Sequence, residues 1–161
     1  MPAPRPPIPH VGLDLVDVPR FEAALARHAD GLARRVFTAA EWAYAATRPA
    51  ERARVLAVRF AAKEAVLKAL GTGWGRGASF RDVEVVGGGR SAPRLVLRGT
   101  VGRLAAAAGL SITISLSHAG NTAAAVAVAV PVAAPPARRP ARRAKAASPK
   151  VPAPRKRPRR R

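Results

Sequence analysis

Apolar residues alternate with polar or small residues over three parts of the chain, which is the pattern of β-strands that bury one face. Residues 11–16 read Val-Gly-Leu-Asp-Leu-Val. Residues 110–117 alternate isoleucine and leucine with serine and threonine, and residues 123–130 bring three valines to one side. Two shorter apolar runs, residues 82–86 and 94–97, flank consecutive glycines and predict a hairpin. The pattern therefore predicts about five strands.

Other segments carry helical signals. Asp17 can cap a helix that has a proline in its first turn and apolar residues at helical spacing. Thr38 begins a second helix, with Glu41 at the spacing of a capping box. The longest helix is predicted over residues 50–70, and an alanine-rich helix over residues 100–108 ends at a glycine. With hairpin-linked strands, this predicts an α+β fold, a small and mostly antiparallel sheet packed on a long central helix.

The second half of the longest predicted helix carries Lys63, Glu64 and Lys68, in a chain that has only nine Asp and Glu residues. Lys63 and Glu64 are adjacent and point in different directions, whereas Glu64 and Lys68 lie one turn apart on one face. A carboxylate with an ammonium group one turn away could hold a metal ion and a phosphate side by side. The same spacing is also that of the commonest surface ion pair on helices, so the spacing alone leaves both interpretations open.

The positive charge is concentrated at the C-terminal end. The 161 residues have a net charge of +20, and residues 131–161 contribute 12 bases and no acid, which leaves +8 for the rest. We expect one domain over residues 11–130, with a disordered leader over residues 1–10 and a disordered basic tail over residues 131–161. Such a tail could contact nucleic acid or other polyanions nonspecifically, or it could be a solvated appendage without a partner.

The composition also bears on the compartment. The chain has no cysteine, which excludes disulfides and cysteine-ligated metal sites and fits a reducing compartment. Residues 1–10 lack the apolar core of a secretory signal. The longest apolar run, residues 123–134, is interrupted by a proline and is shorter than the roughly 20 residues of a membrane span. We therefore expect a cytoplasmic protein with no membrane segment.

Asp14 lies in the middle of an apolar predicted strand, where a carboxylate is costly to bury without a cation or hydrogen-bond donors. It could instead lie at a strand end and cap the turn that follows. If the long helix packs across this strand, Glu64 is the natural second carboxylate. Because Mg²⁺ accepts carboxylate and phosphate oxygens, Asp14 and Glu64 form a candidate Mg²⁺ site.

Further residues could contact a phosphorylated substrate. The glycine-rich residues 71–77 could present backbone N–H groups to phosphates, although a helix end followed by a loop has the same composition. Arg59, Lys63 and Lys68 supply positive charge. His118 ends the strand predicted over residues 110–117 in phase with its apolar face, which suits either a structural or an active-site histidine.

Six segments, in this order, resemble those of the holo-acyl-carrier-protein synthases, the small bacterial 4′-phosphopantetheinyl transferases. They are Val11-Gly12-Leu13-Asp14-Leu15-Val16, Phe37-Thr38 with Glu41, Arg59-Phe60-Ala61-Ala62-Lys63-Glu64-Ala65, Lys68-Ala69-Leu70-Gly71-Thr72-Gly73, Asp82-Val83-Glu84-Val85 and Ser115-Leu116-Ser117-His118. The resemblance covers residues 11–130, and neither terminal extension belongs to it.

The resemblance implies the 4′-phosphopantetheinyl transferase fold and its reaction. This reaction depends on Mg²⁺ and transfers the 4′-phosphopantetheine arm of coenzyme A to a serine of apo acyl carrier protein for fatty acid biosynthesis. Adenosine 3′,5′-bisphosphate is the other product. By position, Asp14 and Glu64 match the metal-binding and catalytic carboxylates of the family, and Lys68 matches the lysine near the reacting phosphate.

The resemblance also implies contacts with coenzyme A and with the carrier protein. Lys63, Gly73 and His118 fall at coenzyme A-binding positions, and Arg20 matches a position that docks the acidic carrier protein. Small members of the family form trimers with active sites between subunits, so a homotrimer is expected here. Ala119 departs from the pattern, because many relatives have a polar residue after the histidine.

In the implied reaction the serine hydroxyl must lose its proton. Glu64 is the candidate base, directly or through a metal-bound water. Two rival functions fit parts of the sequence: a basic nucleic-acid-associated protein and another Mg²⁺-dependent phosphoryl-transfer enzyme. Aromatic residues make up 4% of the chain and are not interleaved with the basic tail, so the sequence offers no stacking platform for nucleic acid.

Overall fold

The structure is a computed structural model that describes residues 10–73, 77–89 and 91–132. Most of the predicted leader and basic tail lies outside the described residues. The first strand begins and the last strand ends one residue outside residues 11–130. His10 begins the first strand opposite Ala129, and Pro131 ends the last strand opposite Leu110, because both positions have backbone partners.

The strands form two separate antiparallel sheets. β1 and β4 flank β5 in a three-stranded sheet, while β2 and β3 form a hairpin of their own. In chain order the elements are β1 (His10–Asp17), α1 (Val18–Arg27), α2 (Ala29–Val36), α3 (Ala39–Ala46), η1 (Pro49–Glu51), α4 (Arg52–Ala69), η2 (Phe80–Asp82), β2 (Val83–Gly88), β3 (Ser91–Leu97), α5 (Gly99–Ala107), β4 (Leu110–Ala119) and β5 (Thr122–Pro131). The predicted α+β class is confirmed.

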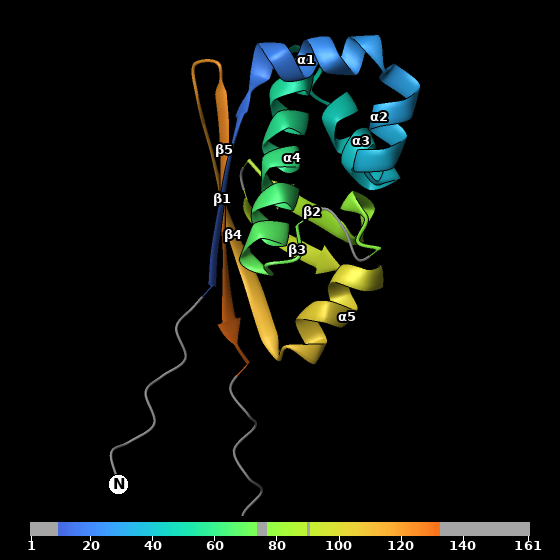
Figure 1. Cartoon of the computed structure of the whole chain (residues 1–161). Helices are drawn as coiled ribbons and strands as arrows, with labels where there is room; N and C mark the ends of the chain where they lie inside the picture. Colours follow the sequence, from blue (N-terminus) through green and yellow to red (C-terminus); the bar gives the residue numbers. More distant parts are fainter. Residues whose placement is uncertain (1–9, 74–76, 90, 133–161) are drawn as a thin grey trace, which may run out of the picture.

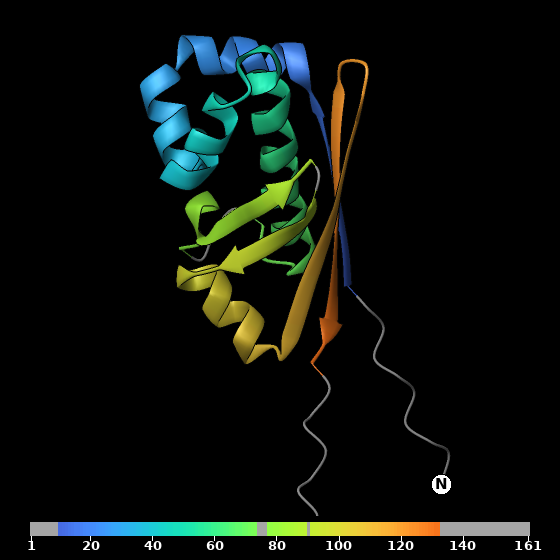
Figure 2. The same cartoon turned by 180° about the vertical axis from the view of Figure 1, so that it is seen from behind.

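Helix α4 is the centre of the molecule. It runs along the three-stranded sheet, with α2 and α3 on the side away from that sheet (Figure 1), and the view from behind shows the same layers (Figure 2). Most of its residues are buried, including the charged Arg59 and Lys63. Because it is covered on both sides, α4 does not have the single apolar stripe of a surface helix.

Strands β1 and β5 present mostly small side chains to α4 and larger apolar ones to the outside, whereas β4 buries Ile114 in the core. Its central strand buries four alanines against the core: Ala123, Ala125, Ala127 and Ala129. The predicted valine side of this strand is the opposite, less buried side. On β1 the apolar residues Val11, Leu13 and Leu15 likewise face outward, with exposed fractions of 61%, 53% and 63%.

Close packing between β1 and α4 explains this choice of faces. Gly12 is buried against α4, and a Cβ atom there would overlap the carbonyl oxygen of Ala65 and lie 2.7 Å from the amide nitrogen of Ala69. Because side chains alternate along a strand, placing Gly12 inward also turns Asp14 and Val16 inward. The short separation of strand and helix therefore brings Asp14 toward α4.

Local sequence signals are confirmed at the helix ends. The Asp17 carboxylate accepts a hydrogen bond from the Arg20 backbone N–H at 2.8 Å and caps α1. Thr38 and Glu41 form the predicted capping box of α3. Both caps satisfy backbone N–H groups that have no partner inside their helix.

Candidate active site

Asp14 and Lys68 form an ion pair between β1 and α4. The Lys68 ammonium donates to Asp14 Oδ1 at 2.8 Å and to the Leu13 carbonyl oxygen at 3.0 Å. The Asp14 side chain is 15% exposed and that of Lys68 is 50% exposed. The alternative role of Asp14 as a strand-end cap is excluded, because it lies inside β1 and Asp17 caps α1.

Glu64 and Asp14 line the same cavity. It measures about 420 Å³, lies between β1, α1 and α4, and is also lined by Arg20, Phe21 and Phe60. Glu64 is one turn before Lys68 on α4, so the helix carries one carboxylate to the cavity and one ammonium to Asp14, which lines that cavity. Three predicted site residues, Asp14, Glu64 and Lys68, are thus brought together from β1 and α4.

This donor set suits a magnesium ion. Among the described residues no group of three or more histidines, cysteines or carboxylates could hold a metal. Two carboxylates at one cavity match the way Mg²⁺ is usually bound, through one or two protein carboxylates, several waters and the phosphates of a substrate. Asp14 and Glu64 would hold the ion, and Lys68 would lie beside it.

The position of Lys63 does not support the predicted coenzyme A contact. Its side chain is fully buried, and the ammonium donates to Glu41 Oε2 at 2.8 Å, to the Phe80 carbonyl oxygen at 3.1 Å and to the Val83 carbonyl oxygen. These acceptors use all three ammonium hydrogens. Lys63 is adjacent to Glu64 in sequence but points to the opposite layer, because neighbouring helix positions face different directions.

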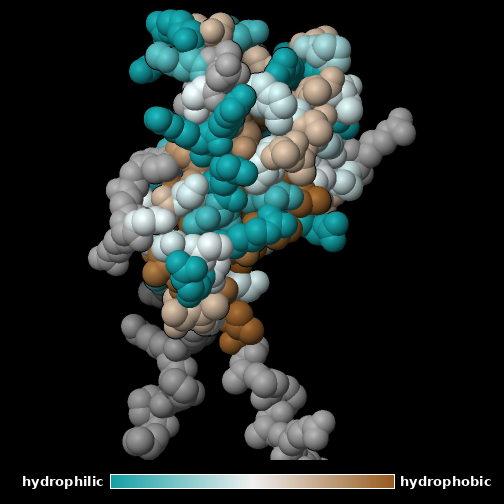
Figure 3. Space-filling model, turned by 90° about the vertical axis from the view of Figure 1, so that its right-hand side faces the viewer, coloured by the Kyte–Doolittle hydropathy of each residue, from teal (hydrophilic) through white to brown (hydrophobic). Residues whose placement is uncertain are grey.

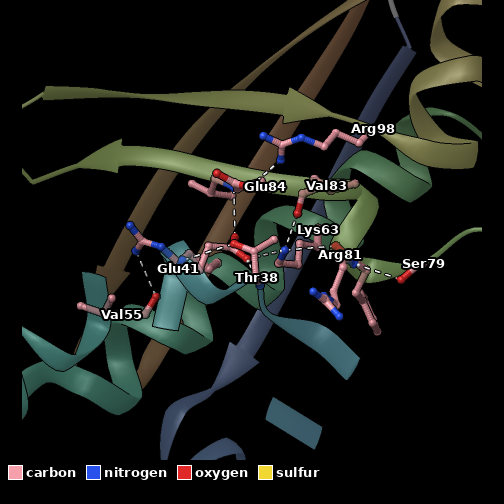
Figure 4. Close-up of polar contacts among 12 residues, drawn as sticks. Thr38, Glu41, Val55, Lys63, Ser79, Arg81, Val83, Glu84 and Arg98 are labelled. Atoms are coloured by element: carbon pink, nitrogen blue, oxygen red, sulfur yellow. Dashed lines mark hydrogen bonds and ion pairs between the residues drawn. The ribbon is translucent and has the colours of Figure 1, made fainter. Parts of the chain in front are cut away.

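Glu41 is the acceptor that joins three elements in that buried layer. Oε2 accepts from Lys63 and from the Thr38 N–H, and Oε1 accepts from the Val85 N–H at 3.0 Å (Figure 4). Desolvation lowers the pKa of Lys63, and the charge of Glu41 opposes that shift. The capping-box spacing identified Glu41 only as a local helix signal, so its long-range role was missed.

A second cavity, of about 440 Å³, contains His118. His118 lies at the end of β4, and the same cavity is lined by Arg48, Arg54 and Arg59. The cavity shares no lining residue with the one that contains Asp14 and Glu64. The single chain therefore separates His118 from the predicted metal pair.

Arg59 is the buried cation of the second cavity. Its side chain donates to the Val55 carbonyl oxygen at 3.3 Å and to the Gly87 carbonyl oxygen at 2.9 Å, and its Nε has no hydrogen-bond partner. Desolvation is the main cause that lowers the pKa of its guanidinium group. A positive charge held by neutral carbonyl groups leaves the cavity attractive to an anion.

The remaining predicted residues are exposed. Gly73 follows α4 with a φ of 54°, a conformation that favours glycine, and residues 74–76 of the glycine-rich segment lie outside the described residues. Arg20 lies on α1 at the edge of the Asp14 cavity. Sequence reasoning did not identify Tyr44, Arg48 and Arg54 in the second cavity, and only the spacing of Tyr44 and Arg48 could have indicated a contact.

Exposed basic residues also lie on helices α1 and α2. Arg20 and Arg27 on α1 and Arg34 and Arg35 on α2 are exposed. On the side of the molecule that carries α2 and α3, hydrophilic residues gather toward the top and run down the middle (Figure 3). Within the described part of the chain, no helix is long and apolar enough to cross a membrane.

Comparison with known proteins identifies the family of this chain. The sequence model of the 4′-phosphopantetheinyl transferase superfamily matches residues 10–129. The chain therefore belongs to the 4′-phosphopantetheinyl transferase superfamily, a class of group-transferring enzymes. Within that class its curated relatives place it in the holo-[acyl-carrier-protein] synthase family.

Two curated relatives illustrate the similarity. The chain is 44% identical over 116 residues to the holo-[acyl-carrier-protein] synthase of Geotalea daltonii, which covers 71% of this chain and 92% of the relative. It is 47% identical over 116 residues to that of Moorella thermoacetica, covering 71% and 88%. These matches confirm the resemblance drawn from the six sequence segments.

Solved structures show the same fold. The ACPS–CoA complex of Chronobacterium ammoniagenes is 30% identical, with a TM-score of 0.67 over 78% of this chain and 99% of that one. The holo-[acyl-carrier-protein] synthase of Helicobacter pylori, in complex with coenzyme A, is 28% identical, with a TM-score of 0.64 over 74% and 98%. The predicted transferase fold is therefore confirmed.

Proposed function

We propose that this protein transfers 4′-phosphopantetheine from coenzyme A to a serine of apo acyl carrier protein, with Mg²⁺ held by Asp14 and Glu64. The observation that carries the proposal is that these carboxylates, from β1 and α4, line one cavity, with Lys68 bonded to Asp14 at 2.8 Å. The coenzyme A complexes of two structural relatives support the choice of substrate.

In the proposed reaction the serine oxygen forms a bond to the β-phosphorus of coenzyme A. The bond from that phosphorus to the bridging oxygen breaks, and adenosine 3′,5′-bisphosphate leaves. Bound Mg²⁺ would neutralise charge on the diphosphate. Lys68 donates a hydrogen bond to the oxygens that gain charge, and Glu64 takes the serine proton, directly or through a water. Asp14 orients the Lys68 ammonium through their ion pair.

The decisive assay is the mass of the carrier protein after incubation with coenzyme A, Mg²⁺ and the enzyme. We expect a gain equal to one phosphopantetheine. Asp14→Ala and Glu64→Ala should each abolish the gain while circular dichroism shows an intact fold. An unmodified carrier with the unsubstituted enzyme would refute the function, and substantial activity in either folded variant would refute the shared metal site.

We further propose a homotrimer whose active sites each combine two protomers. The outer face of the three-stranded sheet supports this, because the exposed Val11, Leu13 and Leu15 on β1 lie beside the valines of β5. The two cavities support it too. The Asp14 cavity of one protomer would bind the diphosphate, and the His118 cavity of the next, with its three arginines, would bind the 3′-phosphate of coenzyme A.

Mixing two inactive variants tests the shared site. Asp14→Ala and His118→Ala protomers, co-expressed in equal amounts, should regain about a quarter of the full activity, because that share of interfaces receives both intact residues. Analytical ultracentrifugation should give the mass of three chains. Monomeric protein, or no regained activity in mixed trimers, would contradict the arrangement. A cytoplasmic location and a polyanion contact of the basic tail remain predictions.

A further inference from the structure

The wall of the His118 cavity is assembled around one aromatic side chain. Tyr44 lies near the end of α3 and is part-buried. Its ring is contacted by two guanidinium groups, with the Cζ of Arg48 3.9 Å and that of Arg59 4.1 Å from the ring centroid. All three residues line the cavity. One side chain therefore contacts two of the cations available to an anionic ligand.

Tyr44 also holds the turn between β2 and β3. Its hydroxyl donates to the Gly88 carbonyl oxygen at 3.2 Å, and Arg59 donates to the neighbouring Gly87 carbonyl oxygen at 2.9 Å. The three glycines of this turn have φ values of 81°, 101° and 70°, which favour glycine. Because Gly88 and Gly89 line the cavity, this turn forms part of its wall.

Arg48 and Arg59 lack the carboxylate partner that usually compensates a buried guanidinium group. Among the described residues, neither Arg48 nor Arg59 has a carboxylate within ion-pair distance. Arg59 is only 3% exposed, and its burial, with a smaller effect from the charge of Arg48, lowers its pKa, whereas Tyr44 and the charge of Glu41 oppose that shift. A ring face attracts a guanidinium group electrostatically, so Tyr44 offsets part of this repulsion without neutralising the cations. Glu51 also lines the cavity, but its ion pair is with Arg54, so the charges of Arg48 and Arg59 remain available to a ligand.

We propose that Tyr44 is a positioning residue that holds Arg48, Arg59 and the Gly87–Gly89 turn as a preformed site for the phosphorylated nucleoside end of coenzyme A. It thereby sets the preference of the enzyme for coenzyme A over 3′-dephospho-coenzyme A. This inference rests on the proposed function, because it takes coenzyme A as the substrate. Tyr44 does not contact the reacting atoms, so its removal should leave the chemical step unchanged.

Steady-state kinetics with both substrates test this role. Tyr44→Leu removes the ring and should raise the KM for coenzyme A about tenfold to thirtyfold, while the KM for 3′-dephospho-coenzyme A changes less than about twofold. The kcat at saturating coenzyme A should be retained. Tyr44→Phe keeps the ring but loses the hydroxyl, with its bond to Gly88 and its interaction with Arg59, so the KM for coenzyme A should rise about twofold to fivefold.

Trp42 provides a matched control on the same helix. Its ring is contacted by Arg52, with the Cζ 4.3 Å from the centroid, but neither residue lines the His118 cavity. Trp42→Leu therefore removes an equivalent aromatic–arginine contact. It should leave unchanged the ratio of kcat/KM for coenzyme A to kcat/KM for 3′-dephospho-coenzyme A. If Trp42→Leu and Tyr44→Leu change that ratio equally, Tyr44 has only a structural role and the inference is overturned.

Calorimetric binding of adenosine 3′,5′-bisphosphate and of AMP separates this inference from the proposed function. The unsubstituted enzyme should bind the bisphosphate more tightly, and Tyr44→Phe should narrow the difference even if Tyr44→Leu does not fold. If the unsubstituted enzyme and Tyr44→Phe prefer adenosine 3′,5′-bisphosphate over AMP by the same factor, the inference is overturned. A bisphosphate preference that depends on Tyr44, in a protein that does not modify the carrier, would overturn the proposed transfer and leave the binding role of Tyr44 standing.

Discussion

Removing the charge of Glu41 should cost a large part of the stability of this domain. Glu41 is 1% exposed and Lys63 is fully buried, so water cannot replace the lost partner. In Glu41→Gln the ammonium keeps two carbonyl acceptors but loses its bonded opposite charge, and only the weaker influence of Glu84 remains. Breaking one side of a buried ion pair destabilises by about 3–5 kcal/mol. Domains of this size are stable by only about 5–15 kcal/mol, so the effect should be plain.

Urea unfolding at neutral pH measures this loss. An exposed pair supplies the control, because Glu51 and Arg54 lie 3.7 Å apart with side chains 56% and 39% exposed. Glu51→Gln should therefore cost no more than about 1 kcal/mol. The double variant Glu41→Gln with Lys63→Met should be more stable than Glu41→Gln alone, because no unpaired charge stays buried.

The pH dependence tests the same reasoning. Burial lowers the pKa of Lys63 below its ordinary 10.5, so between the two values the unfolded chain binds more protons than the folded one. The free energy of unfolding then rises with pH in that window. Removing Glu41 lowers the pKa of Lys63 further and widens the window downward. The destabilisation by Glu41→Gln should therefore shrink as the pH rises toward 10.5.

Two results would refute this account. A free energy of unfolding for Glu41→Gln within about 1 kcal/mol of that of the unsubstituted protein would mean that the pair does not compensate a buried charge. A destabilisation that does not change with pH would mean that the lost hydrogen bonds, and not the uncompensated ammonium, determine the effect.

Two further predictions follow from packing and surface charge. Gly12→Ala should destabilise the domain by about 1–3 kcal/mol or more in urea unfolding, because a Cβ would overlap the Ala65 carbonyl oxygen. Gly31→Ala, where the added Cβ meets nothing within 4 Å, should be neutral or stabilising, and equal losses in both would contradict the packing argument. Arg20→Glu should raise the KM for the carrier protein more than that for coenzyme A, whereas Arg103→Glu, the same charge reversal on α5, should change neither. An unchanged carrier KM in Arg20→Glu would exclude the docking role.

Local signals in the sequence predicted the elements well. Asp17 and Thr38 cap helices because their side chains bond backbone N–H groups within three residues, a geometry that depends only on neighbouring residues. The glycines between β2 and β3 predicted the hairpin for the same reason, since their positive φ values are a property of the turn itself. The six family segments went further, and indicated the transferase family that the comparisons confirmed.

The partners of the charged residues on α4 could not be predicted in this way. Glu64 and Lys68 have the spacing of a helical ion pair, yet Lys68 bonds Asp14 on a strand 54 positions away. Lys63 had the composition of a phosphate ligand, but Glu41 and two carbonyl groups bind it in the interior. Helical periodicity fixes the direction of a side chain relative to its helix, not which layer packs against that side.

What the sequence alone determined here is the set of elements, their order and the residue types that could carry phosphate chemistry, because these depend on neighbours within a few positions. The tertiary structure decided which face of each strand is buried. Close contact of α4 with Gly12 and the alanines of β5 turns the larger apolar residues of most of β1 and β5 outward and Asp14 inward. It also separated His118 from Asp14 within one chain, because cavities form where distant segments meet, and no local pattern records that meeting.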